Sequence, residues 1–301
     1  MRLENKVVLI TGAGSGFGRQ CSLLFAQEGA KILMTDVDSE RAEAAAQWVN
    51  EGSGGDNAKP MTLDVTKEDD VAAGVKAAES TFGKLDIMFA NAGIVSRGGV
   101  PQVMGGEEVE FEDLTDEDWQ NVLAVNLTGV FYCAKHAVPA LKRNGGGTIL
   151  ATSSAASFVG YPNVALYAAT KGGINSLVKG LSWDLGKYGI RVNAICPTHG
   201  MSPNFLMPAG SPVVGKSYEE MAAEMEGAGW DPDASPIPLK LDRPPSLEDN
   251  ARVALFLASD ESKYLSGICL PSTDGGTLSR VSIVFEGIDV AAPEPAGAAT
   301  D

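Results

Sequence analysis

The sequence predicts an α/β fold in which helices cover both faces of a doubly wound, seven-stranded parallel sheet. Short apolar runs alternate along the chain with longer segments of helical composition, an order typical of β-α-β units. The first run, Val-Val-Leu-Ile at residues 7–10, is continuously apolar, which favours a strand buried on both faces. That run leads directly into a cluster of glycines, as a tight strand-to-helix turn requires.

Seven strands and six helices are expected from this alternation. The strands lie where short β-branched or apolar runs end in small or acidic residues, at 6–10, 31–35, 59–63, 85–90, 147–152, 191–196 and 268–270. The helices lie in the longer segments that follow, at 16–28, 39–50, 68–82, 116–143, 162–188 and 246–258.

Three segments interrupt the alternation. Residues 94–115 form a long loop, and eight acidic residues stand between positions 107 and 118. Residues 197–245 hold nine of the chain's 16 prolines and therefore cannot form one long helix. Residues 281–301 are expected to be a C-terminal tail, disordered in part from about Ala291. None of the three has the composition of a second domain, so we expect a single domain over residues 1–280.

The composition is that of a soluble globular protein. Of 301 residues, 44% are hydrophobic and 21% charged, a balance that excludes a disordered chain. No apolar stretch reaches the ~20 residues that span a bilayer, and the first apolar run is too short for a signal peptide. The net charge of −16, from 23 basic and 39 acidic side chains, disfavours nucleic-acid binding. Four scattered cysteines and two histidines predict a reduced, cytoplasmic protein without a metal site.

A glycine-rich turn follows the first predicted strand. It reads Thr-Gly-Ala-Gly-Ser-Gly-Phe-Gly over residues 11–18 and opens into a predicted helix. Glycines permit a tight turn there and let backbone N–H groups approach a pyrophosphate at the positive helix end. One interpretation is a generic strand–helix turn. The other is a Rossmann-type dinucleotide site, held by Gly12, Ser15, Gly16, Phe17 and Gly18.

An aspartate at the end of the second predicted strand favours the dinucleotide site. Asp36 stands 18 residues beyond Gly18, where a carboxylate accepts hydrogen bonds from the adenine ribose hydroxyls. A carboxylate there repels a 2′-phosphate, and no basic residue lies in the glycine turn or immediately after Asp36. The sequence therefore favours NAD over NADP. The alternative is a helix-start or turn aspartate, since Asp38 and Ser39 follow.

A phenol, an ammonium group and a hydroxyl form the candidate catalytic set. Tyr167 and Lys171 are four residues apart and share one face of a predicted helix. Ser154 stands 13 residues before Tyr167, just past a predicted strand end. Such a set suits alcohol–ketone redox chemistry, with Tyr167 as acid or base and Ser154 bonded to the substrate oxygen. The alternative is a surface tyrosine packed on a lysine stem.

The pair predicts a lowered pKa for the tyrosine. A free phenol has a pKa of ~10 and is a poor base at neutral pH. Lowering that pKa to ~7 needs ~4 kcal/mol of phenolate stabilisation, about what one cation ~4 Å away supplies at an effective dielectric of ~20. We therefore expect Lys171 to lower the pKa of Tyr167.

These residues resemble the short-chain dehydrogenase/reductase family, in its compact-core subgroup, over roughly residues 5–280. The motifs that carry the resemblance are Thr11-Gly12-x-x-x-Gly16-x-Gly18, Asp64-Val65, Asn91-Ala92-Gly93, Asn126, Ser154, Tyr167-x-x-x-Lys171 and Asp274-Gly275-Gly276. The resemblance implies that residues 64 and 65 flank the adenine and that residues 91–93 steady the sheet beside the cofactor. It also implies that Asn126 holds a water linked to Lys171, which grips the nicotinamide ribose.

The sequence departs from the family pattern after the sixth predicted strand. The family usually has Pro-Gly there, whereas this chain reads Pro197-Thr198-His199-Gly200-Met201-Ser202. Pro197 stays a cofactor candidate. The resemblance implies that Ser202 takes the place of a family threonine and directs its hydroxyl toward the cofactor's carboxamide or phosphate. His199 has two interpretations, a loop histidine or a residue that touches the substrate.

The substrate is expected to be a bulky, apolar secondary alcohol or ketone, such as an alicyclic, terpenoid, steroid or aromatic compound. Apolar side chains that suit such a substrate, or that only dock the loop, are Phe158, Val159, Tyr161, Met201, Phe205, Leu206, Met207 and Trp230. Two alternatives stay open: a 3-ketoacyl-type reductase of the same fold and a non-catalytic nucleotide sensor. The family resemblance also implies a homo-oligomer, a tetramer or a dimer, through the long helices at 116–143 and 162–188.

Overall fold

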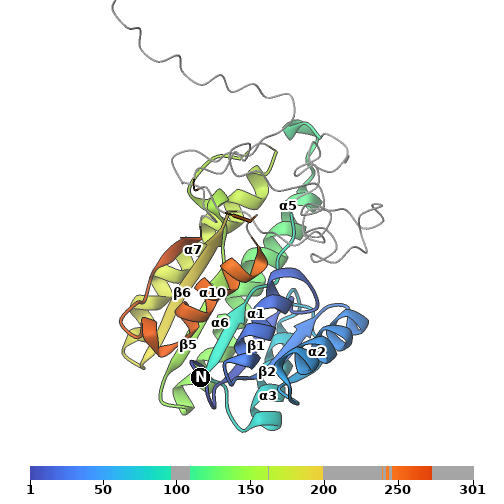
Figure 1. Ribbon diagram of the computed structural model, residues 1–301. Helices are drawn as coiled ribbons and strands as arrows, with labels where there is room; N and C mark the ends of the chain where they lie inside the picture. Colours follow the sequence, from blue (N-terminus) through green and yellow to red (C-terminus); the bar gives the residue numbers. More distant parts are fainter. Residues whose placement is uncertain (96–108, 162, 199–238, 240–241, 244–245, 273–301) are drawn as a thin grey trace, which may run out of the picture.

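The computed structural model describes residues 1–95, 109–161, 163–198, 239, 242–243 and 246–272 (Figure 1). His199 and Ser202 lie outside the described residues, as do the apolar residues at 201, 205–207 and 230, the motif at 274–276 and the predicted tail. Only parts of the predicted loops at 94–115 and 197–245 lie within them.

Seven parallel strands form one sheet, as the sequence predicts. They are β1 (Val7–Thr11), β2 (Lys31–Asp36), β3 (Ala58–Thr62), β4 (Ile87–Ala90), β5 (Gly147–Thr152), β6 (Ile190–Pro197) and β7 (Cys269–Ser272). Their order is β3-β2-β1-β4-β5-β6-β7, so the direction of winding reverses between β1 and β4. In such sheets ligands bind outside the carboxyl ends of the strands at this reversal.

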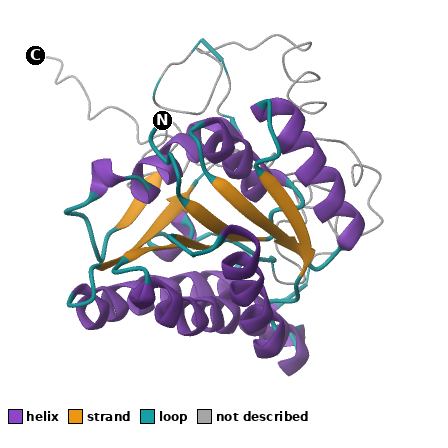
Figure 2. Cartoon of the chain, turned by 90° about the horizontal axis from the view of Figure 1, so that it is seen from below, coloured by secondary structure: helices purple, strands orange, loops and turns teal. Residues whose placement is uncertain are grey.

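Helices cover both faces of the sheet (Figure 2). The helices α1 (Gly16–Gln27), α2 (Ser39–Ser53) and α10 (Leu247–Ala258) contribute buried residues to one core cluster with Val8, Ile10 and Phe89. The helices α3 (Glu68–Phe82), α6 (Gly129–Arg143) and α7 (Ala165–Gly186) pack on the other face in a second cluster with Leu9, Met88 and Ile149. Strands buried on both faces explain why their sequences are continuously apolar.

The predicted helix at 116–143 differs from the structure in its middle. It consists of α5 (Asp116–Leu123), a π-helical turn at Ala124–Thr128 and α6, in direct succession. The π turn carries Asn126, whose amide bonds the backbone of Ile94 across the core. Single π turns inside α-helices often occur at functional sites.

The other predicted elements differ from the observed ones only at their ends. The helix predicted at 162–188 begins at Ala165, two residues after Asn163, whose φ of 59° is left-handed. The strand predicted at 85–90 begins at Ile87. Just before it, the Asp86 carboxylate accepts from the Val7 N–H at 2.7 Å, and the Asp86 N–H donates to the Val7 carbonyl oxygen at 2.9 Å.

Candidate active site

The glycine turn brings helix α1 close to the ends of β1 and β4. Gly12 has a φ of +63°, and a Cβ on it would lie 2.8 Å from the Cα of Ala92. A Cβ on Gly18 would lie 2.4 Å from the carbonyl oxygen of Gly12. Ser15, with a φ of −154°, stands at the N-cap of α1 but makes no side-chain capping bond. The positive end of α1 is therefore left for an anion.

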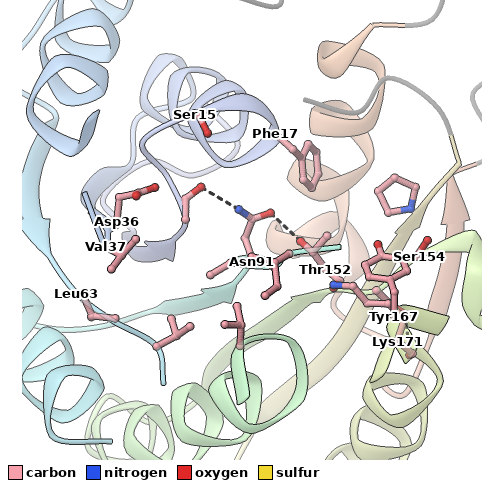
Figure 3. Close-up of a pocket in the computed structure, with 18 of the residues that line it drawn as sticks. Ser15, Phe17, Asp36, Val37, Leu63, Asn91, Thr152, Ser154, Tyr167 and Lys171 are labelled. Atoms are coloured by element: carbon pink, nitrogen blue, oxygen red, sulfur yellow. Dashed lines mark hydrogen bonds between the residues drawn. The ribbon is translucent and has the colours of Figure 1, made fainter. Parts of the chain in front are cut away.

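Asn91 ties together the ends of three strands. Its Nδ2 donates to the carbonyl oxygens of Thr11 and Gly12, at 3.0 and 3.2 Å. The hydroxyl of Thr152, at the end of β5, donates to Asn91 Oδ1 at 2.9 Å (Figure 3). The Thr11 hydroxyl accepts from the backbone N–H groups of Asn91 and Ala92, at 3.0 and 3.1 Å. This network fixes the floor of the cleft at the reversal of the sheet.

Asp36 lies at one end of the cleft and is held by the backbone. Its carboxylate accepts from the N–H groups of Gly14 and Asp38, both at 3.1 Å. Arg41, which the sequence reading did not single out, lies beside it. The Arg41 guanidinium donates to Asp38 at 3.0 Å and comes within 4.0 Å of Asp36. The sequence signal was weak because Arg41 follows five residues later, in the first turn of α2.

Asp64 and Val65 lie next along the cleft wall. Burial raises the pKa of the Asp64 carboxyl, but hydrogen bonds from Thr66 and the nearby Lys67 ammonium outweigh it, so the pKa is lowered. The Thr66 hydroxyl and N–H donate to Asp64 at 2.7 and 3.0 Å. Val65 packs against Gly129, where a Cβ would lie 3.0 Å from the Val65 side chain.

Ser154, Tyr167 and Lys171 meet at the opposite end of the cleft from Asp36 (Figure 3). Tyr167 and Lys171 lie on successive turns of α7, and Ser154 follows β5. The Lys171 side chain is only 1% exposed, and its Nζ donates to the Thr152 carbonyl oxygen at 2.7 Å. The Nζ lies 5.4 Å from the centre of the Tyr167 ring.

The pKa of Tyr167 is opposite to the sequence expectation. Burial raises it, and a hydrogen bond with the Ser154 side chain opposes that shift. Burial also lowers the pKa of the Lys171 amine, to about 8. Desolvation favours the neutral form of both groups. At Tyr167 it outweighs the opposing interactions, so Lys171 alone does not lower the pKa of the phenol.

Asn126 is fully buried behind Gly93 and Lys171. Its Oδ1 accepts from the Ile94 N–H at 2.8 Å, and its Nδ2 donates to the Ile94 carbonyl at 2.9 Å and to Thr170 at 3.2 Å. Both amide hydrogens therefore go to the protein, one to Ile94, which follows Gly93, and one to Thr170 on α7. The water-holding role implied by the family resemblance stays a prediction.

A cavity of about 370 Å³ joins the two ends of the site, within the usual range for ligand pockets. Its predicted lining residues are Gly12, Ser15, Phe17, Asp36, Asp64, Val65, Asn91, Ala92, Gly93, Ser154, Tyr167, Lys171 and Pro197. Those that the sequence reading missed are Val37, Arg41, Leu63, Ile94, Val125, Thr152, Ser153 and Asn250. The predicted residues Gly16, Gly18 and Asn126 are buried outside the lining, where they shape the cleft instead of facing it.

Two features are absent from the part of the chain that the structure describes. Within it, no helix is long and apolar enough to cross a membrane. The same residues contain no group of three or more His, Cys, Asp or Glu side chains placed to hold a metal ion.

The residues of the cleft fit a dinucleotide. At one end lie the uncapped end of a helix, a carboxylate, and glycines whose surroundings leave no room for a Cβ. At the other end lie a phenol and an amine. The first group suits phosphate and ribose, and the second suits proton transfer to or from a substrate oxygen.

The comparisons with known proteins define the class. A family model described as short chain dehydrogenase matches residues 6–205, and the chain belongs to that family. Secoisolariciresinol dehydrogenase of Forsythia intermedia is 38% identical over 276 residues, which cover 91% of this chain and 90% of the relative.

A bacterial enzyme and a solved structure agree with this assignment. Trans-4-hydroxycyclohexanecarboxylate dehydrogenase of Sinomonas cyclohexanicum is 36% identical over 279 residues, covering 91% of this chain and 93% of the relative. The crystal structure of levodione reductase matches with a TM-score of 0.73 and 31% identity, covering 91% of this chain and 98% of that one. The chain is an oxidoreductase of a family that typically binds a nicotinamide cofactor.

Proposed function

We propose that the protein is a dehydrogenase that transfers a hydride between NAD(H) and a bulky, apolar secondary alcohol or ketone. One observation carries the proposal. A single cavity has Asp36 at one end and Ser154, Tyr167 and Lys171 at the other. This arrangement gives one site for a ribose and one for acid–base chemistry.

The charges around Asp36 support NAD over NADP. The Asp36 carboxylate is held by two backbone N–H groups, so it is fixed in place to accept from the ribose hydroxyls. The Arg41 guanidinium faces two carboxylates, those of Asp36 and Asp38. The three side chains carry a net charge of −1, and a 2′-phosphate would be repelled.

The side chains at the other end supply the acid–base chemistry. When bound, the oxidised nicotinamide supplies the hydride acceptor and a positive charge. Tyr167 takes the hydroxyl proton during alcohol oxidation and returns it during ketone reduction. Ser154 bonds the substrate oxygen and also the Tyr167 hydroxyl, which lowers the pKa of the phenol. Lys171 is anchored by the Thr152 carbonyl and grips the nicotinamide ribose.

The substrate class is supported by the apolar wall of the cleft and by the relatives. Ile94 and Val125 line the cavity, and Phe158, which is exposed, follows Ser154 closely in the chain. Two relatives are named as dehydrogenases of trans-4-hydroxycyclohexanecarboxylate and of secoisolariciresinol. We therefore propose that ring alcohols or their ketones are the substrates of this chain.

An absorbance assay of the nicotinamide tests the proposal. Cyclohexanol, a bicyclic terpenoid alcohol and a steroid alcohol are offered with NAD and with NADP, beside a 3-hydroxyacyl thioester and a sugar alcohol. We expect the highest kcat/KM with NAD and a ring alcohol. Preference for the acyl thioester with NADP would favour the 3-ketoacyl-type reductase. No turnover with any compound would favour the nucleotide sensor, although its expected sign, loss of a catalytic side chain, is absent here.

We also propose that the protein is a homo-oligomer, with a tetramer favoured. An apolar groove between the π turn, α6 and α7 is lined by Leu127, Thr128, Phe131, Gly173 and Leu177. Phe131 is a large exposed apolar side chain, which fits a surface covered by another copy. Light scattering of the purified protein measures the mass, and a Phe131→Glu variant is expected to lower it. A wild-type monomer would contradict the proposal.

A further inference from the structure

Asn175 is a buried amide that the mechanism above does not use. It lies on α7, one turn beyond Lys171 and two turns beyond Tyr167, so the three residues share a helix face. It is 6% exposed. A buried amide is costly unless it is hydrogen-bonded, so its partners indicate why it is placed there.

A directed chain of hydrogen bonds runs from Asn175 to the segment that carries Ser154. The Asn175 Nδ2 donates to the Ser157 hydroxyl at 2.7 Å. That hydroxyl in turn donates to the Ser154 carbonyl oxygen at 2.5 Å. Because Ser157 both accepts and donates, the two bonds link α7 to the backbone of Ser154 through one hydroxyl.

Two neighbouring contacts hold the ends of this series of hydrogen bonds in place. The Ser153 hydroxyl donates to the Lys171 carbonyl at 3.0 Å, which fixes the same segment to α7 one turn earlier. The Cys196 thiol, on β6, donates to Asn175 Oδ1 at 3.9 Å, which leaves the amide nitrogen directed at Ser157. The 153–157 segment and the catalytic helix are thus joined at two points.

We propose that Asn175 is a positioning residue for catalysis, which acts through Ser157 to set the place of Ser154 relative to Tyr167. This inference rests on the proposed dehydrogenase chemistry of these side chains. Ser154 has to reach both the substrate oxygen and the Tyr167 hydroxyl. The Ser154 carbonyl oxygen accepts from the Ser157 N–H at 3.0 Å and from the Ser157 hydroxyl, which Asn175 orients.

The pH dependence of turnover separates this role from a purely structural one. The Ser154 hydrogen bond lowers the pKa of Tyr167, so a displaced Ser154 leaves that pKa higher. Among the described residues, the titratable groups that face Tyr167 are Lys171 on its own helix, Cys196 on β6 and Tyr161 before α7. Substitution of Asn175 or Ser157 removes none of these groups.

The test compares Asn175→Leu, which is nearly isosteric, with Ser157→Ala and Ser157→Thr. Asn175→Leu and Ser157→Ala are each expected to lower kcat by ~10-fold to ~100-fold, the scale of small misplacements at a reacting centre. Their KM for the cofactor is expected to stay unchanged. The rise of alcohol oxidation with pH is expected to move to higher pH. Ser157→Thr keeps the hydroxyl and is expected to keep the wild-type rate and profile.

A control and a second variant make the result decisive. Cys269→Ala removes a thiol that donates to the Asn175 backbone carbonyl at 3.7 Å. It leaves the hydrogen bonds from Asn175 to Ser157 and from Ser157 to Ser154 intact, so wild-type kinetics are expected. The assays use the nicotinamide cofactor and the alcohol that the wild type is found to turn over. A substrate of another class would therefore overturn the proposed function but not this inference. If Asn175→Leu fails to fold, Ser157→Ala decides. A lower melting temperature with unchanged kcat and pH profile would overturn the inference.

Discussion

The burial of Lys171 predicts a measurable loss of stability at neutral pH. Burial lowers the pKa of its amine from 10.5 to about 8, while the unfolded chain keeps the ordinary value. Between these two values the unfolded state binds more protons, so stability rises with pH through that window. Below pH 8 the wild type carries the full penalty of about 3 kcal/mol, since one pKa unit is about 1.4 kcal/mol.

Replacement of the amine by an apolar side chain of similar length removes this penalty. Lys171→Met is expected to abolish activity. Its stability relative to wild type is expected to decline by about 2 kcal/mol between pH 7 and pH 9.5. The lost hydrogen bond to the Thr152 carbonyl costs roughly 1–3 kcal/mol but is independent of pH. The test is therefore how the difference in unfolding free energy between Lys171→Met and the wild type changes with pH.

Urea unfolding followed by circular dichroism at pH 7, 8, 9 and 9.5, without cofactor, measures this difference. Lys179→Met is the matched control, because Lys179 is exposed on the same helix, and its difference from wild type is expected to stay flat. A flat difference for Lys171→Met as well would refute the reasoning, since it would mean that the amine keeps its ordinary pKa in the folded protein.

Two further predictions concern the cofactor end of the cleft. Asp36→Ala is expected to narrow the preference for NADH over NADPH by at least ~5-fold, since one repulsive charge pair is worth about 1–4 kcal/mol. Fluorescence titration measures both affinities, and an unchanged ratio would count against the role of the carboxylate. Gly18→Ala is expected to lower both the melting temperature and the cofactor affinity, because its Cβ would lie 2.4 Å from the Gly12 carbonyl oxygen. Gly172→Ala, whose Cβ would meet nothing within 4 Å, is expected to be stabilising by roughly 0.5–1 kcal/mol. Equal melting temperatures for the two variants would show that the close approach at Gly18 is unimportant.

The centre of the sheet was predictable because its strands are buried on both faces and are therefore mostly apolar, as at Val7–Thr11. Irregular turns inside helices were harder to predict from the sequence. The π turn at Ala124–Thr128 carries Asn126, which bonds Ile94, 32 residues away. The residues near position 126 give no sign of a contact with a segment so far away. The sequence therefore indicates one continuous helix there.

The candidate site was predictable where its residues follow strand ends in order. Asp36 ends β2 and Asn91 follows β4, and the carboxyl ends of parallel strands meet at one edge of the sheet. Asn250, at the start of α10, carried no motif, and its place in the cleft depends on packing of the last helix. The pKa of Tyr167 was predicted in the wrong direction because the reasoning included the charge of Lys171 but not the desolvation of both groups.

The comparison of wild type with Tyr167→Phe, as kcat/KM for ring-alcohol oxidation against pH, tests the proposed chemistry most directly. We predict a wild-type rate that rises with pH as one group loses a proton. The variant is expected to bind the cofactor normally but to react slower by at least ~10²-fold, the usual scale for a positioned acid–base group. A variant that oxidises the alcohol at the wild-type rate with the same pH profile would contradict the assignment of Tyr167 as the proton acceptor.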